Sequence, residues 1–230
     1  MSDRQGALEQ FYALLDDLSE RIGGPKHLNS PNLAALAPHA GLYFFFEPGE
    51  QRPNGNPRVV RVGTHALTGT SGSSLWGRLR QHRGVLGGSN PGGGNHRGSI
   101  FRHHVGAALL NRRGDADLLR SWLGPKPSPD LRDRERVLEV EVSRRICAMP
   151  FLWLAVPNRA DHTSDRGLLE RNTIALLSAL TGSPEGPHDA WLGLHAVAPK
   201  VRAAGLWNVN HVDDPFQEDA LDLLAAYVKR

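Results

Sequence analysis

Cysteine and long hydrophobic runs are nearly absent from this chain of 230 residues. The single cysteine, Cys147, excludes an internal disulfide framework and a cluster of thiolate metal ligands. No apolar run approaches the roughly 20 residues that a membrane-spanning helix needs. The N-terminal sequence MSDRQG also lacks the basic and apolar regions of a signal peptide. We therefore expect a cytoplasmic protein with no membrane partner.

Acidic residues are missing from a long central stretch, since no Asp or Glu lies between Glu50 and Asp115. The same stretch contains no lysine, so its cations are ten arginines and five histidines. A guanidinium group binds two phosphate oxygens at once, which makes nucleic acid the first candidate partner. A solvated basic face explains the charge equally well, because the rest of the chain holds all 24 acidic residues.

The remaining composition is that of a globular protein, and 40% hydrophobic residues suffice to bury one core. Apolar periodicity predicts helices at 6–22, 75–82, 99–111, 134–145, 164–182, 197–204 and 215–227, and strands at 41–47, 58–66 and 150–157. This order predicts an α/β chain of the α+β type. We expect a small three-stranded, mainly antiparallel sheet flanked by helices, with helical extensions at both ends.

The predicted hairpin and the helix after it resemble the GIY-YIG nuclease superfamily. The triplet G-L-Y at 41–43 resembles the first signature of that family, and R-V-G at 61–63 resembles the second. Arg78 and His82 resemble the catalytic arginine and its companion histidine, and their spacing puts both on one helix face. The resemblance extends over roughly residues 40–210 and includes His96, Glu170 in L-L-E-R-N and Asn208 in L-W-N.

The resemblance implies a metal-dependent endonuclease that hydrolyses phosphodiester bonds in DNA. It implies one Mg²⁺ or Mn²⁺ ion on Glu170, with water and phosphate oxygens as the other ligands. Arg78 would clamp the scissile phosphate, and Tyr43 with His82 would activate the attacking water. Asn208 would bond the phosphate or a site water. Each residue also has an ordinary explanation: Glu170 could pair with Arg166 or Arg171, and Tyr43 could be a packing residue.

Arg61 stands where the second signature has a tyrosine, and a guanidinium group cannot act as a general base. Arg61 is then a second phosphate clamp, or the chain is a catalytically inert nucleic-acid-binding module. A nuclease that acts on RNA is a further alternative to one that acts on DNA.

Further contacts to the nucleic acid are expected from the glycines of the two signatures, which would let backbone approach a ligand, and from nearby cations. These residues are Gly41, Gly63, His65, Arg80, Arg83, His96, Arg97 and Arg102. The expected division of the chain is an N-terminal helical extension over 1–35, a GIY-YIG-like domain over 36–212 with an insertion at about 114–146, and a C-terminal helix over 213–230.

Overall fold

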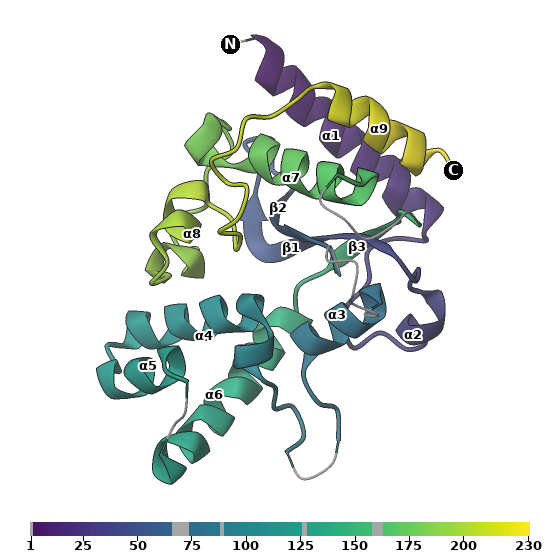
Figure 1. Ribbon diagram of the computed structural model, residues 1–230. Helices are drawn as coiled ribbons and strands as arrows, with labels where there is room; N and C mark the ends of the chain where they lie inside the picture. The colour runs from purple at the N-terminus through teal and green to yellow at the C-terminus, as the bar shows by residue number, and fades with distance from the viewer. Residues whose placement is uncertain (1, 66–73, 88–89, 126–127, 158–162) are drawn as a thin grey trace.

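The computed structural model describes residues 2–65, 74–87, 90–125, 128–157 and 163–230. A three-stranded sheet lies at the centre of the molecule (Figure 1). Its strands are β1 (Gly41–Gln51), β2 (Pro57–Gly63) and β3 (Phe151–Ala155), in the order β2-β1-β3. Both neighbours of β1 run antiparallel to it. The predicted α+β fold with a small antiparallel sheet is thus confirmed.

Helices cover both faces of the sheet. The α-helices are α1 (Ser2–Arg21), α2 (Leu33–Leu36), α3 (Leu75–Arg83), α4 (Ile100–Arg113), α5 (Ala116–Leu123), α6 (Pro129–Cys147), α7 (Asp165–Leu177), α8 (Pro199–Ala204) and α9 (Asp219–Val228). Short 3₁₀ turns are η1 (His96–Gly98), η2 (Ala179–Thr181) and η3 (Leu192–His195). Serine side chains begin several helices, because Ser74, Ser99 and Ser164 each accept a hydrogen bond from the first-turn backbone.

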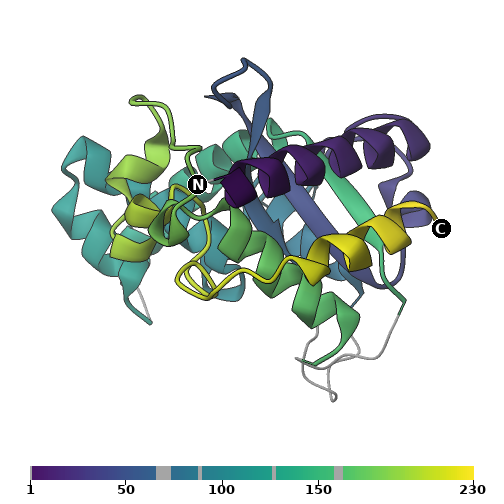
Figure 2. The ribbon, with the colours of Figure 1, turned by 90° about the horizontal axis from the view of Figure 1, so that it is seen from above.

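One face of the sheet packs against the two ends of the chain. Leu42, Phe44 and Phe46 point from β1 into an apolar core that includes residues of α1, α7 and α9. Helices α1 and α9 lie side by side across this face in both views (Figures 1 and 2). The N-terminal and C-terminal helices therefore complete the same core as the central strand.

The opposite face of the sheet carries Tyr43, the tyrosine of the first signature. Successive side chains of a strand point to opposite faces, so Tyr43 and Phe45 point away from the first core. They join a second core with residues of α3, α4 and α6. The ring of Phe45 lies between an aromatic ring of α4 and one of the paired strand β3, with ring centroids 5.5 Å from Phe101 and 5.1 Å from Phe151. Helices α3 and α4 therefore pack on aromatic side chains of this second face.

A β-bulge in β2 decides which way Arg61 points. Phe45 pairs with Arg61 while the next residue, Phe46, pairs with Val59, so one extra residue lies opposite that step of β1. The bulge leaves Val59 and Val62 in the first core and Val60 in the second. Arg61, directly opposite Phe45, therefore shares the face of Tyr43.

Several boundaries differ from the sequence prediction. Strand β1 runs on to Gln51, and the long helix predicted over 164–182 ends at Leu177, with a separate 3₁₀ turn after it. Within the stretch 114–133, predicted as a polar linker or insertion, residues 116–123 form α5 and α6 begins at Pro129. Helix α5 was missed because it is short and stands next to the polar run G-P-K-P-S-P; Leu118 and Trp122 are buried in the core, and Leu119 packs against it. Within the described residues, no helix is both long and apolar enough to cross a bilayer.

We predict that Gly63→Ala destabilises the protein by about 1–3 kcal/mol, the usual cost of overpacking. A β-carbon at Gly63 would overlap the hydroxyl and ring of Tyr43, which faces it across the hairpin. The matched control is Gly186→Ala, where a β-carbon meets no atom within 4 Å. Urea unfolding measures both variants, and equal stability of the two would contradict this packing.

Candidate active site

Tyr43 and His82 form the centre of the site. The Tyr43 hydroxyl lies 2.9 Å from Nε2 of His82, and Nδ1 of the same imidazole lies 2.8 Å from Oγ of Ser99. Tyr43 and His82 are fully buried, and Ser99 is 1% exposed. The strand, helix α3 and the start of α4 therefore meet in one hydrogen-bonded chain.

Glu139 of helix α6 supports the hydrogen-bonded residues through buried contacts. Arg102 donates to the backbone oxygen of His82 at 2.8 Å and pairs with the carboxylate of Glu139. The other oxygen of Glu139 accepts from the backbone N–H of His96 at 2.7 Å and lies 2.8 Å from its ring. Trp122 stacks on that ring at 3.5 Å. His82 is thus fixed at its side chain by Ser99 and at its backbone by Arg102.

Arg61 reaches across the same face toward helix α4. Its guanidinium donates to the backbone oxygen of Trp207 and lies 4.9 Å from the ring centroid of Phe101. Its Nε is buried and has no hydrogen-bond partner among the described residues. Arg61 therefore brings a buried positive charge to the place where the second signature has a tyrosine.

Glu170 and Arg78 lie nearer the surface than the tyrosine and histidine pair. Glu170 on α7 is partly exposed, and its Oε1 accepts from the backbone N–H of Thr64 at 3.2 Å. Arg78 on α3 is also partly exposed and donates to Oε1 of Gln81 at 2.9 Å. Sequence reasoning missed Thr64, which follows directly after the second signature.

The charges of Arg61 and Arg78 act on both His82 and Glu170. Burial lowers the pKa of His82 well below its usual value, and the charges of Arg61 and Arg78 lower it further. Burial raises the pKa of Glu170, while the same two arginines and His211 act against that rise. A neutral imidazole and a carboxylate that lacks full hydration therefore share one pair of cations.

Asn208 serves the sheet edge in this structure. Its amide oxygen accepts from the backbone N–H of Val62 at 3.2 Å, and its amide nitrogen donates to the oxygen of Val62 at 2.8 Å. The neighbouring backbone N–H of Trp207 bonds the oxygen of Val60 at 2.7 Å. Asn208 thus satisfies a strand edge beside Arg61, and its role toward a ligand stays a prediction.

The two signature glycines have packing reasons of their own. A β-carbon on Gly41 would overlap the backbone oxygen of Leu154 in β3, and one on Gly63 would overlap the Tyr43 ring. The glycines make room for the adjacent strand and for the tyrosine, and the expected approach of a ligand is not needed to explain them.

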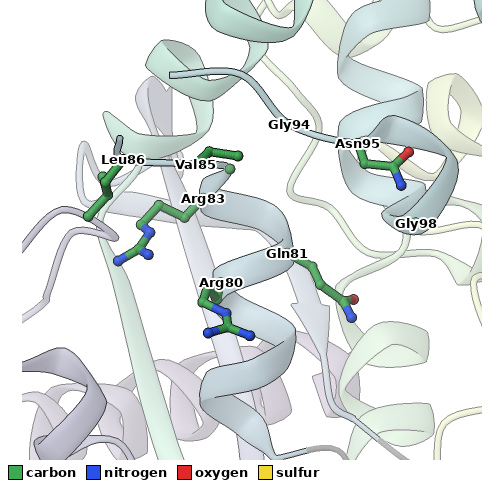
Figure 3. Close-up of a pocket in the computed structure, with 9 residues that line it drawn as sticks. Arg80, Gln81, Arg83, Val85, Leu86, Gly94, Asn95 and Gly98 are labelled. Carbon is green, nitrogen blue, oxygen red and sulfur yellow. The ribbon is translucent and has the colours of Figure 1, made fainter. Parts of the chain in front are cut away.

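The predicted basic contacts divide into two groups. His96 and Arg102 are buried and contact Glu139, whereas Arg97 is exposed and pairs with Glu135. Carboxylates of α6 account for the positions of these three side chains, and their contacts to a ligand stay a prediction. His65 is buried, and this burial together with the charge of Arg166 lowers its pKa to about 4. Arg80 and Arg83 instead line a cleft beside α3 (Figure 3).

Sequence reasoning did not single out Ser99 or Glu139. Ser99 carries the signal of a helix N-cap, and its oxygen does accept from the backbone of Arg102 at 3.4 Å. Glu135 and Glu139 lie four residues apart, which puts two carboxylates on one face of a helix. That spacing was the available signal, but nothing local tells which arginines the carboxylates meet.

The residues present fit a single hard cation at Glu170. Its Oε1 is held by Thr64, and its Oε2 has no hydrogen-bond partner in the described parts of the chain. A cation would relieve the burial cost that raises the pKa of this carboxylate. Across the described residues, no group of three or more His, Cys, Asp or Glu side chains is arranged to hold a metal. The donor set is therefore one carboxylate, with other ligands from solvent or substrate.

The fold and the site define an α+β protein whose single carboxylate, partly exposed arginine and buried tyrosine–histidine pair suit a phosphate-bearing ligand. The chain belongs to the GIY-YIG domain family, whose model matches residues 2–230. Members of this family are generally nucleases, and membership implies nucleic-acid binding. The comparisons with curated proteins and with solved structures gave no match.

The buried histidines make the stability of the protein depend on pH. Burial and the charge of Arg61 lower the pKa of His104 to about 4, whereas an unfolded histidine titrates near 6.5. The unfolded state therefore binds more protons between these values, so stability is full above about pH 6.5 and falls as the pH drops toward 4. His65 acts in the same direction.

We predict that His104→Asn removes part of this loss, about 2 kcal/mol between pH 7 and pH 5. Urea unfolding at the two pH values measures the difference, with exposed His195→Asn as the matched control. An unchanged pH dependence in His104→Asn, equal to that of the control, would contradict the assignment.

Proposed function

We propose that the protein is a metal-dependent endonuclease that hydrolyses phosphodiester bonds, with DNA as its first substrate. The observation that carries the proposal is the 2.9 Å bond between Tyr43 and His82, beside the two arginines that also act on Glu170. Phosphodiester hydrolysis needs a proton acceptor near the attacking water, a cation near the phosphate, and charge neutralisation at the leaving oxygen. Each need has a candidate within this one site.

Glu170 would hold Mg²⁺ or Mn²⁺ through its free oxygen. A metal bound there supplies a Lewis acid that polarises the phosphate and offsets the charge of the leaving oxygen. Thr64 orients the carboxylate by donating its backbone N–H to the other oxygen. The metal-dependent character that is typical of the family supports this assignment.

Arg78 is the proposed phosphate clamp. It is partly exposed on α3, and the residues that its guanidinium contacts, Gln81 and Gly98, leave other donors of the group available. A planar guanidinium binds two phosphate oxygens and stays charged at any pH of interest. Arg61, deeper in the site, adds positive potential without touching a carboxylate in the described residues.

Tyr43 and His82 are proposed to handle the proton. The low pKa of His82 keeps its ring neutral near pH 7. In the tautomer whose Nδ1–H donates to Ser99, Nε2 accepts the hydroxyl hydrogen of Tyr43. The lone pairs of the tyrosine oxygen then remain to accept a hydrogen bond from the attacking water, and the hydroxyl oxygen of Ser99 is the acceptor that this tautomer requires.

A second candidate function is a catalytically inert nucleic-acid-binding module. Two observations favour it: Arg61 replaces a tyrosine, and both Tyr43 and His82 have no exposed surface. In that case the hydrogen-bonded chain serves packing, and the surface arginines alone meet the nucleic acid.

We predict that the wild type cuts supercoiled plasmid with Mg²⁺ or Mn²⁺ and that chelation of the metal stops cutting. Glu170→Gln and Arg78→Ala should each reduce the rate by about 100-fold or more, the usual cost of losing one charge-stabilising group. Single-stranded DNA and structured RNA are tested in parallel, so that the assay also identifies the substrate.

The matched control is Arg112→Ala, an exposed arginine near the end of α4, which should cut at the wild-type rate. Residual cutting that is the same in all variants would show a contaminating nuclease and overturn the assignment of the site. Retained binding without any cutting favours the inert module, and Arg61→Tyr is then the variant to test for restored activity.

A further inference from the structure

Half of the ten arginines in the acid-free stretch pair with carboxylates from elsewhere in the chain. The partners come from β1, from α6 and from the segment before η3, and they leave little free charge on the arginines that they meet. The pairs are Arg52–Glu185, Arg58–Glu50, Arg97–Glu135, Arg102–Glu139 and Arg113–Glu141. The basic field that the sequence suggests is therefore much smaller in the folded protein.

The remaining positive charge gathers on one helix. In the described part of the chain, five arginines of this stretch have no carboxylate within ion-pair distance: Arg61, Arg78, Arg80, Arg83 and Arg112. Three of them belong to α3. Folding thus concentrates on α3 a charge that the sequence spreads over some sixty positions.

A cleft of about 520 Å³ opens beside this helix. Arg80 and Arg83 extend from α3, Val85 and Leu86 continue from its end, and Asn95 lies across from it (Figure 3). None of the described residues that line the cleft is acidic. Its volume falls within the range of small-ligand sites and is large enough for one nucleotide.

The free polar groups of the side chains that line the cleft are hydrogen-bond donors. Gln81 uses its amide oxygen to accept from Arg78, and Asn95 uses its own to accept from the backbone of Arg97. Their amide nitrogens have no partner among the described residues, so both offer N–H groups. Together with two guanidinium groups they suit phosphate oxygens and the carbonyl edges of bases, and they repel cations.

An apolar edge completes the cleft. Val85 is 49% exposed and Leu86 is 62% exposed, although both are large hydrophobic side chains. A nucleobase can cover such an edge with its face only when it is not stacked in a duplex. The apolar edge therefore favours an unpaired base.

The cleft also adjoins the proposed phosphate clamp. Arg78 donates to Gln81 at 2.9 Å and reaches the backbone oxygen of Gly98 at 3.5 Å, and both of these residues line the cleft. A strand whose phosphate lies on Arg78 would continue directly into it.

We infer that the α3 cleft, formed by Arg80, Gln81, Arg83, Val85, Leu86 and Asn95, binds an unpaired nucleotide next to the phosphate held by Arg78. This inference rests on the proposed function and names the substrate class of the same site: a single-stranded or frayed strand. Arg80 and Arg83 bind its phosphate, Val85 and Leu86 cover its base, and the two amides bond the base edge.

The test measures binding by fluorescence anisotropy, without metal and in the presence of chelator, for labelled single-stranded DNA, single-stranded RNA and duplex DNA of equal length. Arg80→Ala/Arg83→Ala should weaken binding of single strands at least tenfold and reduce the slope of log affinity against log salt by about 1.4. Val85→Ser/Leu86→Ser should weaken single strands roughly tenfold and leave duplex binding unchanged. The two single-stranded probes distinguish DNA from RNA as the source of the nucleotide.

Matched controls are Arg112→Ala and exposed Val137→Ser, which should bind like the wild type. Equal affinity of cleft variants and controls overturns the inference, as does equal weakening of duplex and single strands or a wild type that binds no probe. The proposed nuclease and the proposed cleft are tested separately. If the wild type cuts with metal and the cleft variants bind like the controls, the nuclease stands without the cleft. Cleft-dependent binding without cutting retains the cleft alone.

Discussion

The arrangement of the site depends on the hydrogen bonds and the ion pair that the buried carboxylate of Glu139 makes. It accepts from the backbone and ring of His96 and from the guanidinium of Arg102, which in turn holds the backbone of His82. Charges are costly to bury unless each finds its partners. Here the carboxylate of Glu139 and the donors of His96 and Arg102 satisfy one another, and these bonds tie α3, η1 and α4 to α6.

The central strand imposes a second constraint, because both of its faces are buried. Its apolar residues alternate between two cores, and Glu47, which shares the face of Tyr43, is fully engaged in the interior. The carboxylate of Glu47 accepts from the indole nitrogens of Trp191 and Trp207, each at 2.9 Å, and from Arg145. This pairing fixes the segment that contains Asn208 beside β2, and it places the backbone oxygen that Arg61 binds.

Burial and charge together divide the site into two layers. The inner layer, Tyr43, His82 and Arg61, is removed from solvent and held by defined partners. The outer layer, Arg78 and Glu170, is partly exposed and incompletely partnered in the described residues. A ligand with phosphate groups would meet the outer layer first, and the inner layer would set the electrostatic potential that it experiences.

The sequence by itself determined most of the longer helices and the three strands, α5 excepted, and the helix that carries Arg78 and His82, because these follow from local periodicity and from the 3.6-residue turn of the helix. It also determined the hairpin, since turn residues and β-branched residues act over short distances. Only the tertiary structure decided which arginines remain free. Arg102 and Glu139 are 37 positions apart, and Arg52 and Glu185 are 133 apart. Ion pairs of this kind form between surfaces that folding brings together, so no local pattern in the chain reveals them.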